Sequence, residues 1–228
     1  MNQICPGIYR WTAPHPEWRT RIEWGHEVAS FALVTGDALS LVDPLLPPTS
    51  SGRRDEVRRA LDDLVARAGR LDIMITIPYH TRSAEELYAR YRTRVDATVW
   101  GHPAVAKRLR DEATPLEQIR PGSPVGRSAV AHAIGKPRRH EMPLYFPTHR
   151  ALAFGDAVIG IDGTLRVWQQ ASTDPAWYAG RFVPTLRPLL DLDVERVLVT
   201  HGPPVVHDAG RALENALAAG PWDYRNAA

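Results

Sequence analysis

Four apolar segments of the sequence each lead into a polar residue that lies near proline or glycine. "LVDP" carries Asp43, "ITIPYH" carries His80, "FGDAV" carries Asp156 and "VLVTHGPP" carries His201. An apolar strand that ends in a polar side chain is a common way to present a functional group from a rigid support. Imidazoles and carboxylates in such positions bind divalent metals or transfer protons. The four segments therefore predict a metal site or an acid–base site.

A glutamate in the loop after His80 extends the possible metal donors. Glu85, Asp156 and His201 together offer two carboxylates and one imidazole, which suits a single zinc, iron or manganese ion. His80 then serves as a fourth ligand, as a group behind the ligands or as a general base. Zinc is the first expectation among these metals, and the alternative is a site that holds no metal.

A helix-capping role is the alternative for the acidic residues of this loop. In "SAEE", Ser83 and Glu86 have the spacing of a capping box, in which each side chain bonds a backbone N–H group. A carboxylate at Glu85 in the first turn also favours the helix dipole. Both roles are open for Glu85 on the sequence alone.

Nine apolar segments have the length and composition of β-strands, and turns rich in proline and glycine separate them. Apolar stripes and capping residues predict helices over 53–69, 173–191 and 208–220, the second of them broken at Pro184 and Pro188. This order favours sheets covered by helices on the outside, in one α/β domain over residues 1–228. The strand segments are "GIYRWTA", "VASFALVTG", "ALSLVDPL", "LDIMITI", "DATVWG", "SAVAHAI", "MPLYFP", "RALAFG" and "RVLVTHG".

Charge and cysteine content make several partner classes unexpected. The 28 basic and 26 acidic residues give a net charge of +2 and are mixed along the chain, so we expect no nucleic-acid or membrane partner. No apolar run approaches the roughly 20 residues that span a bilayer, and the N-terminal residues lack the pattern of a signal peptide. With Cys5 as the single cysteine, we expect a cytoplasmic protein that binds a small-molecule ligand or substrate. The sequence does not indicate an oligomeric state.

The order and setting of the strand ends resemble the metallo-β-lactamase superfamily. The resemblance runs from "GIYRW" through "SLVDPLLP", "MITIPYH" and "LYFPTHRALAFGDAV" to "ERVLVTHGPPV" and so covers most of the chain. It implies a four-layer αββα sandwich of two similar halves, with metals held by loop residues at one edge of the sheets. It also implies that Asp43 is chiefly structural.

The signature loop of that family, His-x-His-x-Asp-His, is only partly kept. Laid on this sequence, its four metal-binding positions are His80, Arg82, Ala84 and Glu85. Arginine has no lone pair to give to a metal, so the resemblance is to a divergent member with a degenerate metal motif. If the guanidinium of Arg82 points inward, it takes the place of one cation, with Asp156 as its partner. The sequence therefore argues against a two-metal site.

The later motifs of the family are better kept. Its Gly-Asp pair, whose carboxylate bridges two metals, corresponds to Gly155 and Asp156, and its final strand-end histidine corresponds to His201. Its middle histidine has no clean counterpart, and Glu141 or His140 in "RRHEMPLYF" is nearest.

The resemblance implies a hydrolase that acts on an ester, lactone, thioester or amide with one metal, with His80 and Asp156 as catalytic residues. The first alternative is a metal-free relative that binds a small anionic ligand or a partner in the former active-site pocket, through Arg82. A further alternative is a metal-free enzyme in which His80 is the general base of an elimination or isomerisation.

Three tryptophans near the N-terminus are candidates for contact with substrate. Trp11, Trp18 and Trp24, with His15 and Pro16 between the first two, are placed to form an aromatic flap over the mouth of the site, where the family often has a substrate loop. The alternative is that they pack against the edge of a sheet.

Overall fold

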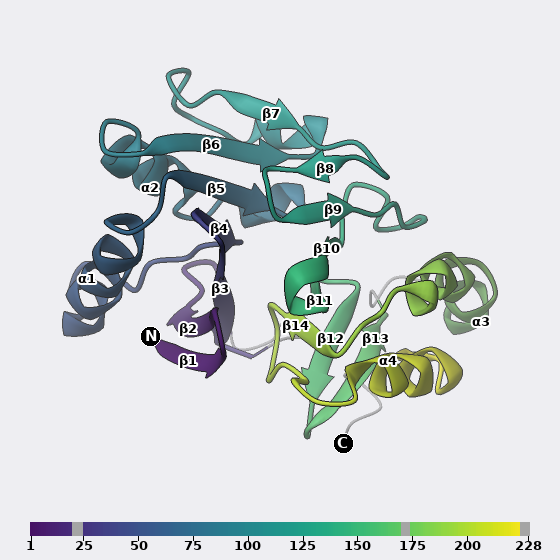
Figure 1. The fold of residues 1–228 in the computed structure, drawn as a ribbon. Coiled ribbons are helices and arrows are strands. Elements are labelled where there is room, and N and C mark those ends of the chain that lie inside the picture. Colours follow the sequence, from purple (N-terminus) through teal and green to yellow (C-terminus); the bar gives the residue numbers. More distant parts are fainter. Residues whose placement is uncertain (20–24, 170–173, 224–228) are drawn as a thin grey trace.

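The computed structural model describes residues 1–19, 25–169 and 174–223, and it has two main β-sheets with helices on both outer sides (Figure 1). Helices α1 and α2 lie on one outer side, and α3 and α4 lie on the other. The α-helices are α1 (Gly52–Val65), α2 (Ala84–Tyr91), α3 (Pro175–Trp177) and α4 (Ala209–Ala218). The other helical segments are η1 (Pro78–His80), η2 (Pro103–Lys107), η3 (Pro147–His149), η4 (Tyr178–Phe182) and η5 (Val183–Asp191).

The first sheet has the strand order β1-β2-β3-β4-β5-β6-β7. Neighbouring strands from β1 to β4 are antiparallel, and those from β4 to β7 are parallel. Because β4 and β5 pair in parallel, with Val42 opposite Met74, their carboxyl ends lie at the same edge of the sheet. The strands are β1 (Asn2–Cys5), β2 (Ile8–Pro14), β3 (Glu27–Thr35), β4 (Ala38–Val42), β5 (Arg70–Ile75), β6 (Asp96–Gly101) and β7 (Leu116–Gln118).

The second sheet has the order β14-β11-β10-β9-β8, and β12, β13 and β15 form a smaller sheet. Strands β11 and β14 are parallel, with Phe154 opposite Val199, so their carboxyl ends also coincide. The strands are β8 (Pro124–Val125), β9 (Ala129–Ala131), β10 (Leu144–Phe146), β11 (Ala151–Phe154), β12 (Val158–Ile161), β13 (Thr164–Trp168), β14 (Arg196–Val199) and β15 (Pro221–Trp222).

The hydrophobic core is divided into layers that match this arrangement. Side chains of α1 and α2, such as Leu61 and Leu87, pack on the outer face of the first sheet. A second cluster, which includes Phe31 and Phe146, fills the space between the two sheets. A third lies between the second sheet and the α4 and η5 segments and includes Leu213. Each buried side chain of this size stabilises the fold by roughly 1.5–3 kcal/mol, so both helical layers are held by apolar burial.

The predicted fold class is confirmed. The order of layers is helix, sheet, sheet, helix, and each of the nine apolar segments contains a strand. The helix predicted over 173–191 is broken as expected: it runs as α3, a π-helical turn at η4 and a 3-10 helix at η5 that contains Pro188. The hairpin of β12 and β13 was not predicted, although its strands alternate around a turn at Asp162 and Gly163.

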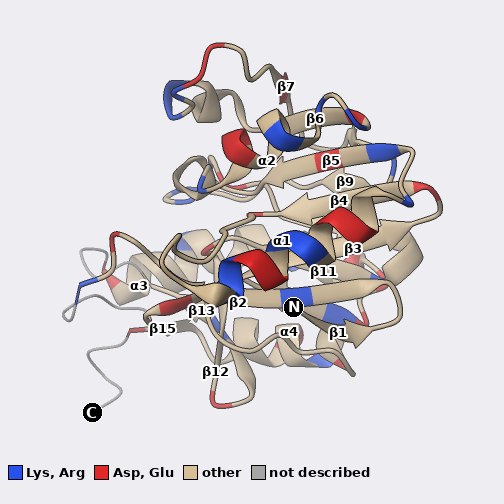
Figure 2. Cartoon of the chain, turned by 90° about the vertical axis from the view of Figure 1, so that its left-hand side faces the viewer, with Lys and Arg blue, Asp and Glu red and all other residues tan. Residues whose placement is uncertain are grey.

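In the view of Figure 2, basic and acidic residues are interspersed over the chain. Basic and acidic segments alternate along α1, whose first turn carries Asp55. Among the helices of the described residues, none is long and apolar enough to cross a membrane.

Candidate functional site

The four strand ends predicted to carry chemistry lie at one edge of the two sheets. Asp43 follows β4, His80 ends η1 just after β5, Asp156 follows β11 and His201 follows β14. A hydrogen bond links the two sheets at this edge: the Ala29 N–H of β3 donates to the carbonyl of Thr200, which follows β14, at 2.7 Å. The positions of these side chains therefore follow from two parallel strand pairs that end at a shared edge.

The carboxylate of Asp156 lies at the centre of the site. Its Oδ1 is 3.2 Å from Nε2 of His80 and 3.2 Å from Nε2 of His201. One ligand atom from each of these three residues lies within 4.8 Å of the other two. His80 and His201 are buried, and Asp156 is half-buried. Two imidazoles and one carboxylate thus converge on one small volume.

Asp43 supports the ring of His80 from behind. The Nδ1 atom of His80 is 2.9 Å from Oδ2 of Asp43. The buried Asp43 carboxylate also accepts bonds from the backbone N–H of Thr76 at 2.8 Å, from its hydroxyl and from the hydroxyl of Thr200. A carboxylate behind a histidine fixes the orientation of the ring and raises its basicity as a metal ligand. The structural role that the resemblance implied for Asp43 is therefore also a role in the site.

The charges of the site shift the pKa values of its members. Burial alone would raise the pKa of Asp156, but the neighbouring His80, His201 and Arg138 outweigh it and hold that pKa well below its usual value. Burial and Arg82 lower the pKa of His80, yet the carboxylates of Asp43 and Asp156 raise it overall. Burial lowers the pKa of His201. Both ring nitrogens of His80 face carboxylate oxygens, which suits a protonated ring whenever no metal takes the Nε2 position.

Arg138 is the cationic partner of Asp156, and sequence reasoning missed it. Its Nη1 donates to Oδ2 of Asp156 at 3.2 Å, and its guanidinium carbon lies 5.0 Å from the ring centre of Trp168. Trp168 also packs edge-on against His201, with ring centres 5.2 Å apart. Arg138 begins the segment "RRHEMPLYF", in which the sequence analysis considered only His140 and Glu141.

The predicted pairing of Arg82 with Asp156 is therefore corrected. The Nη1 atom of Arg82 donates to the carbonyl of Asp43 at 2.9 Å and to the carbonyl of Ala29 at 3.3 Å. These bonds turn its guanidinium toward the backbone of β3 and the end of β4. Both Asp43 and Arg82 have positive φ angles, 46° and 42°, which non-glycine residues rarely adopt and which are common at functional sites.

Glu141, rather than His140, lies at the site. Its Oε1 accepts the N–H groups of Gly155 at 2.9 Å and Ala157 at 3.1 Å, so it holds the turn that presents Asp156. Burial raises the pKa of Glu141 to about 7. His140 instead stacks with His102, with ring centres 4.6 Å apart. Of the two residues considered for the middle histidine of the family, Glu141 occupies the position near the Gly-Asp turn.

The structure does not bring Glu85 into the cluster. Its Oε1 accepts the backbone N–H groups of Arg110 at 2.7 Å and Asp111 at 2.6 Å. The predicted metal role of Glu85 is corrected, since these bonds hold the carboxylate at the loop after η2. The capping box is also absent at this helix start, because the Ser83 hydroxyl accepts the N–H of Leu46.

Replacing Glu85 should leave metal binding unchanged. We expect Glu85→Gln to bind zinc with the affinity of the wild-type protein, because the carboxamide oxygen can still accept both backbone N–H groups. Competition with a chromophoric chelator measures the affinity. A fall in zinc affinity of tenfold or more would indicate that Glu85 binds the metal.

The three tryptophans do not form one flap in the described residues. Trp11 is buried in the core under α1, and its Nε1 donates to the carbonyl of Leu45 at 2.8 Å. This position is the packing alternative, so the substrate role of Trp11 is corrected. Trp18 is half-buried and packs against His26, with ring centres 5.1 Å apart. Trp24 lies outside the described residues.

The corrected role of Trp11 predicts a stability effect. We expect Trp11→Phe to lower the free energy of unfolding by about 1–3 kcal/mol, because the buried carbonyl of Leu45 loses its donor. Substrate affinity should stay unchanged. Denaturant unfolding and steady-state kinetics measure the two quantities, and an unchanged stability with a raised KM would favour the flap instead.

Comparison with known proteins points to one fold. Neither protein-family models nor curated proteins match this chain. Among solved structures, a metallo-β-lactamase from Erythrobacter litoralis shares 15% identity over 95% of this chain and 93% of its own, with a TM-score of 0.64. A metallo-β-lactamase family protein from Thermus thermophilus shares 16% identity over 94% and 79%, with a TM-score of 0.59. The chain adopts the metallo-β-lactamase fold. A β-lactamase domain protein from Burkholderia ambifaria agrees, at 16% identity over 95% and 75% and a TM-score of 0.63.

Three residues of this metallo-β-lactamase fold could hold a metal ion. His80, Asp156 and His201 converge as nitrogen and oxygen donors, with Asp43 behind His80, which is the donor set and support of a metal with an open position. A second cation beside Asp156 would meet the guanidinium of Arg138, which already bonds Oδ2. Positive charge at that place is therefore supplied by the chain itself.

Proposed function

We propose that this chain is a hydrolase that uses one divalent metal ion held by His80, Asp156 and His201. The observation that carries the proposal is the convergence of three ligand atoms within 4.8 Å of one another at a buried site. The support that Asp43 gives His80 adds to it, because a metal-ligating histidine almost always donates its other ring N–H to a carboxylate, a carbonyl or water. Zinc fits best, and iron or manganese are the alternatives.

When bound, the ion would supply Lewis-acid activation of water and of a substrate carbonyl. Asp43 holds the His80 ring so that Nε2 faces the centre of the site. Asp156 stays ionised because its pKa is low, so its carboxylate can accept a hydrogen bond from an attacking water. Arg138 bonds that carboxylate, and the guanidinium of Arg138 lies over the ring of Trp168.

The substrate class proposed is an ester, lactone, thioester or amide, in which a water attacks a carbonyl carbon. The test is a panel with one member of each class, p-nitrophenyl acetate, a γ-lactone, a thioester and an anilide. It is assayed after chelator treatment and again after reloading with zinc, iron or manganese. Hydrolysis of at least one member should depend on the added metal. Activity that survives chelation unchanged, or no hydrolysis by any loaded form, would contradict the proposal.

A second candidate function is the binding of a small anionic ligand or a partner by a metal-free protein. The contact of Arg138 with Asp156 favours it, because the carboxylate is already neutralised by a cation of the chain. The metal content of the purified protein separates the two candidates.

A further inference from the structure

A pocket of about 340 Å³ opens beside the candidate metal centre. Pro78, Tyr79 and Thr81 of the loop that carries His80 form one wall. The other walls include Arg82, Arg108, Arg110 and His15. His15 is near enough to the centre for the charges of His80, His201 and Asp156 to act on it. A molecule in this pocket therefore lies next to the proposed site of hydrolysis.

In the described part of the chain, no carboxylate forms an ion pair with the guanidinium of Arg82. Its bonds run from Nη1 to two backbone carbonyls. The Nε and Nη2 atoms are buried and have no hydrogen-bond partner among the described residues. A buried guanidinium that keeps free donors is costly unless an anion meets it. Arg82 also lines the pocket, so its positive charge lies in the pocket wall.

Two further arginines lie at the exposed rim. The guanidinium of Arg108 lies over the ring of Tyr79, 4.6 Å from its centre, and Tyr79 is 64% exposed. Arg110 is exposed, and no ion pair of its side chain occurs among the described residues. An arginine stacked on an exposed tyrosine offers both a charge and a flat apolar face.

The acids of the pocket do not cancel this charge. The carboxylate of Glu85 accepts two backbone N–H groups, from Arg110 and Asp111. Glu17 is exposed at the rim, where solvent screens it. Three guanidinium groups face two carboxylates, so the pocket carries an excess of positive charge.

We propose that this pocket binds an anionic group, a carboxylate or a phosphate, carried by the substrate on a flat or aromatic body. Arg82 attracts the anion from the pocket wall, Arg108 and Arg110 contact it from the rim, and Tyr79 contacts the body. The proposal rests on the proposed function in one respect, because it takes the bound molecule to be the substrate.

Isothermal titration calorimetry with benzoate and phenyl phosphate tests it, with benzyl alcohol as the neutral probe. The full chain is titrated both as purified and after chelator treatment, so that binding is measured independently of metal and of hydrolysis. We expect at least one anion to bind, in both preparations, and benzyl alcohol to bind at least tenfold more weakly. The anion that binds more tightly identifies the group.

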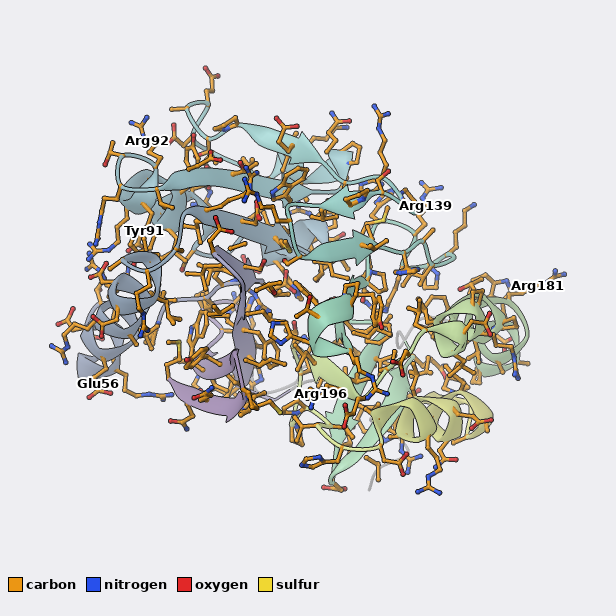
Figure 3. All side chains as sticks on the ribbon, viewed as in Figure 1. Glu56, Tyr91, Arg92, Arg139, Arg181 and Arg196 are labelled. Atoms are coloured by element: carbon orange, nitrogen blue, oxygen red, sulfur yellow. The ribbon has the colours of Figure 1, made fainter. Side chains whose placement is uncertain are left out.

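Variants make the result specific. The double variant Arg108→Ser/Arg110→Ser changes exposed residues and should weaken anion binding about tenfold, and Arg82→Gln should abolish it. Arg181→Ser is the matched control, because Arg181 is exposed, lies on η4 and points away from the body of the protein (Figure 3). Absence of binding by both anions overturns the proposal, as does equal binding by the double variant and the control. If an anion binds but no substrate of the panel is hydrolysed, the anion-binding proposal stands and the hydrolase proposal fails.

Discussion

We expect Asp43→Ala to lower the free energy of unfolding by about 3–5 kcal/mol, the usual cost of removing one partner from a buried charged network. The carboxylate is buried and holds His80, the N–H and hydroxyl of Thr76 and the hydroxyl of Thr200. Its removal leaves buried donors without an acceptor. It also removes the carboxylate whose charge acts most strongly on Arg82. The loss therefore exceeds that of a single hydrogen bond.

Denaturant unfolding of Asp43→Ala measures this loss, with Asp37→Ala as the matched control. Asp37 pairs with Arg127 at the surface, where both side chains are more than half exposed. An exposed pair of this kind contributes about 0–1 kcal/mol. If the two variants lost the same stability, Asp43 would not be the structural anchor of the site.

Asp156→Asn should abolish metal binding and hydrolysis together. The carboxamide is a weaker metal ligand than a carboxylate. It also lacks the negative charge that pairs with Arg138, His80 and His201. Removing a group behind the ligands costs about 10–100-fold in metal affinity, so we expect the loss of this ligand to exceed about 100-fold. Competition with a chromophoric chelator measures the affinity, and circular dichroism checks the fold.

Asp162→Asn is the control for that substitution. Asp162 is exposed at the turn between β12 and β13 and has a positive φ of 48°, which asparagine tolerates well. We expect it to bind zinc like the wild-type protein. Zinc binding by Asp156→Asn that equals the control would remove Asp156 from the set of ligands.

The strand ends show why much of the site could be predicted from the sequence. His80, Asp156 and His201 each follow a continuous apolar segment, and such segments form parallel or buried strands whose ends gather at one edge. The fold follows for the same reason, since alternating strands and amphipathic helices have few ways to bury their apolar faces.

The sequence could not predict contacts made by long side chains from distant loops. Arg138 reaches Asp156 from a loop with no regular pattern, and nothing local distinguishes it from Arg139. The sequence leaves Glu85 with two roles, as a metal ligand or at a helix start. Its carboxylate instead accepts backbone N–H groups of residues 25 and 26 positions away. The neighbours of Trp11 leave a flap and packing on the sheet both open, and its position in β2 directs it into the core. These outcomes depend on tertiary packing rather than on local propensity.

Metal content is best measured by plasma mass spectrometry, on protein purified without chelator or a histidine tag. We expect about one zinc, iron or manganese ion per chain, bound by His80, Asp156 and His201, and its loss in Asp156→Asn. Protein that holds no metal after incubation with excess zinc would contradict a one-metal site, and so would two tightly bound ions per chain.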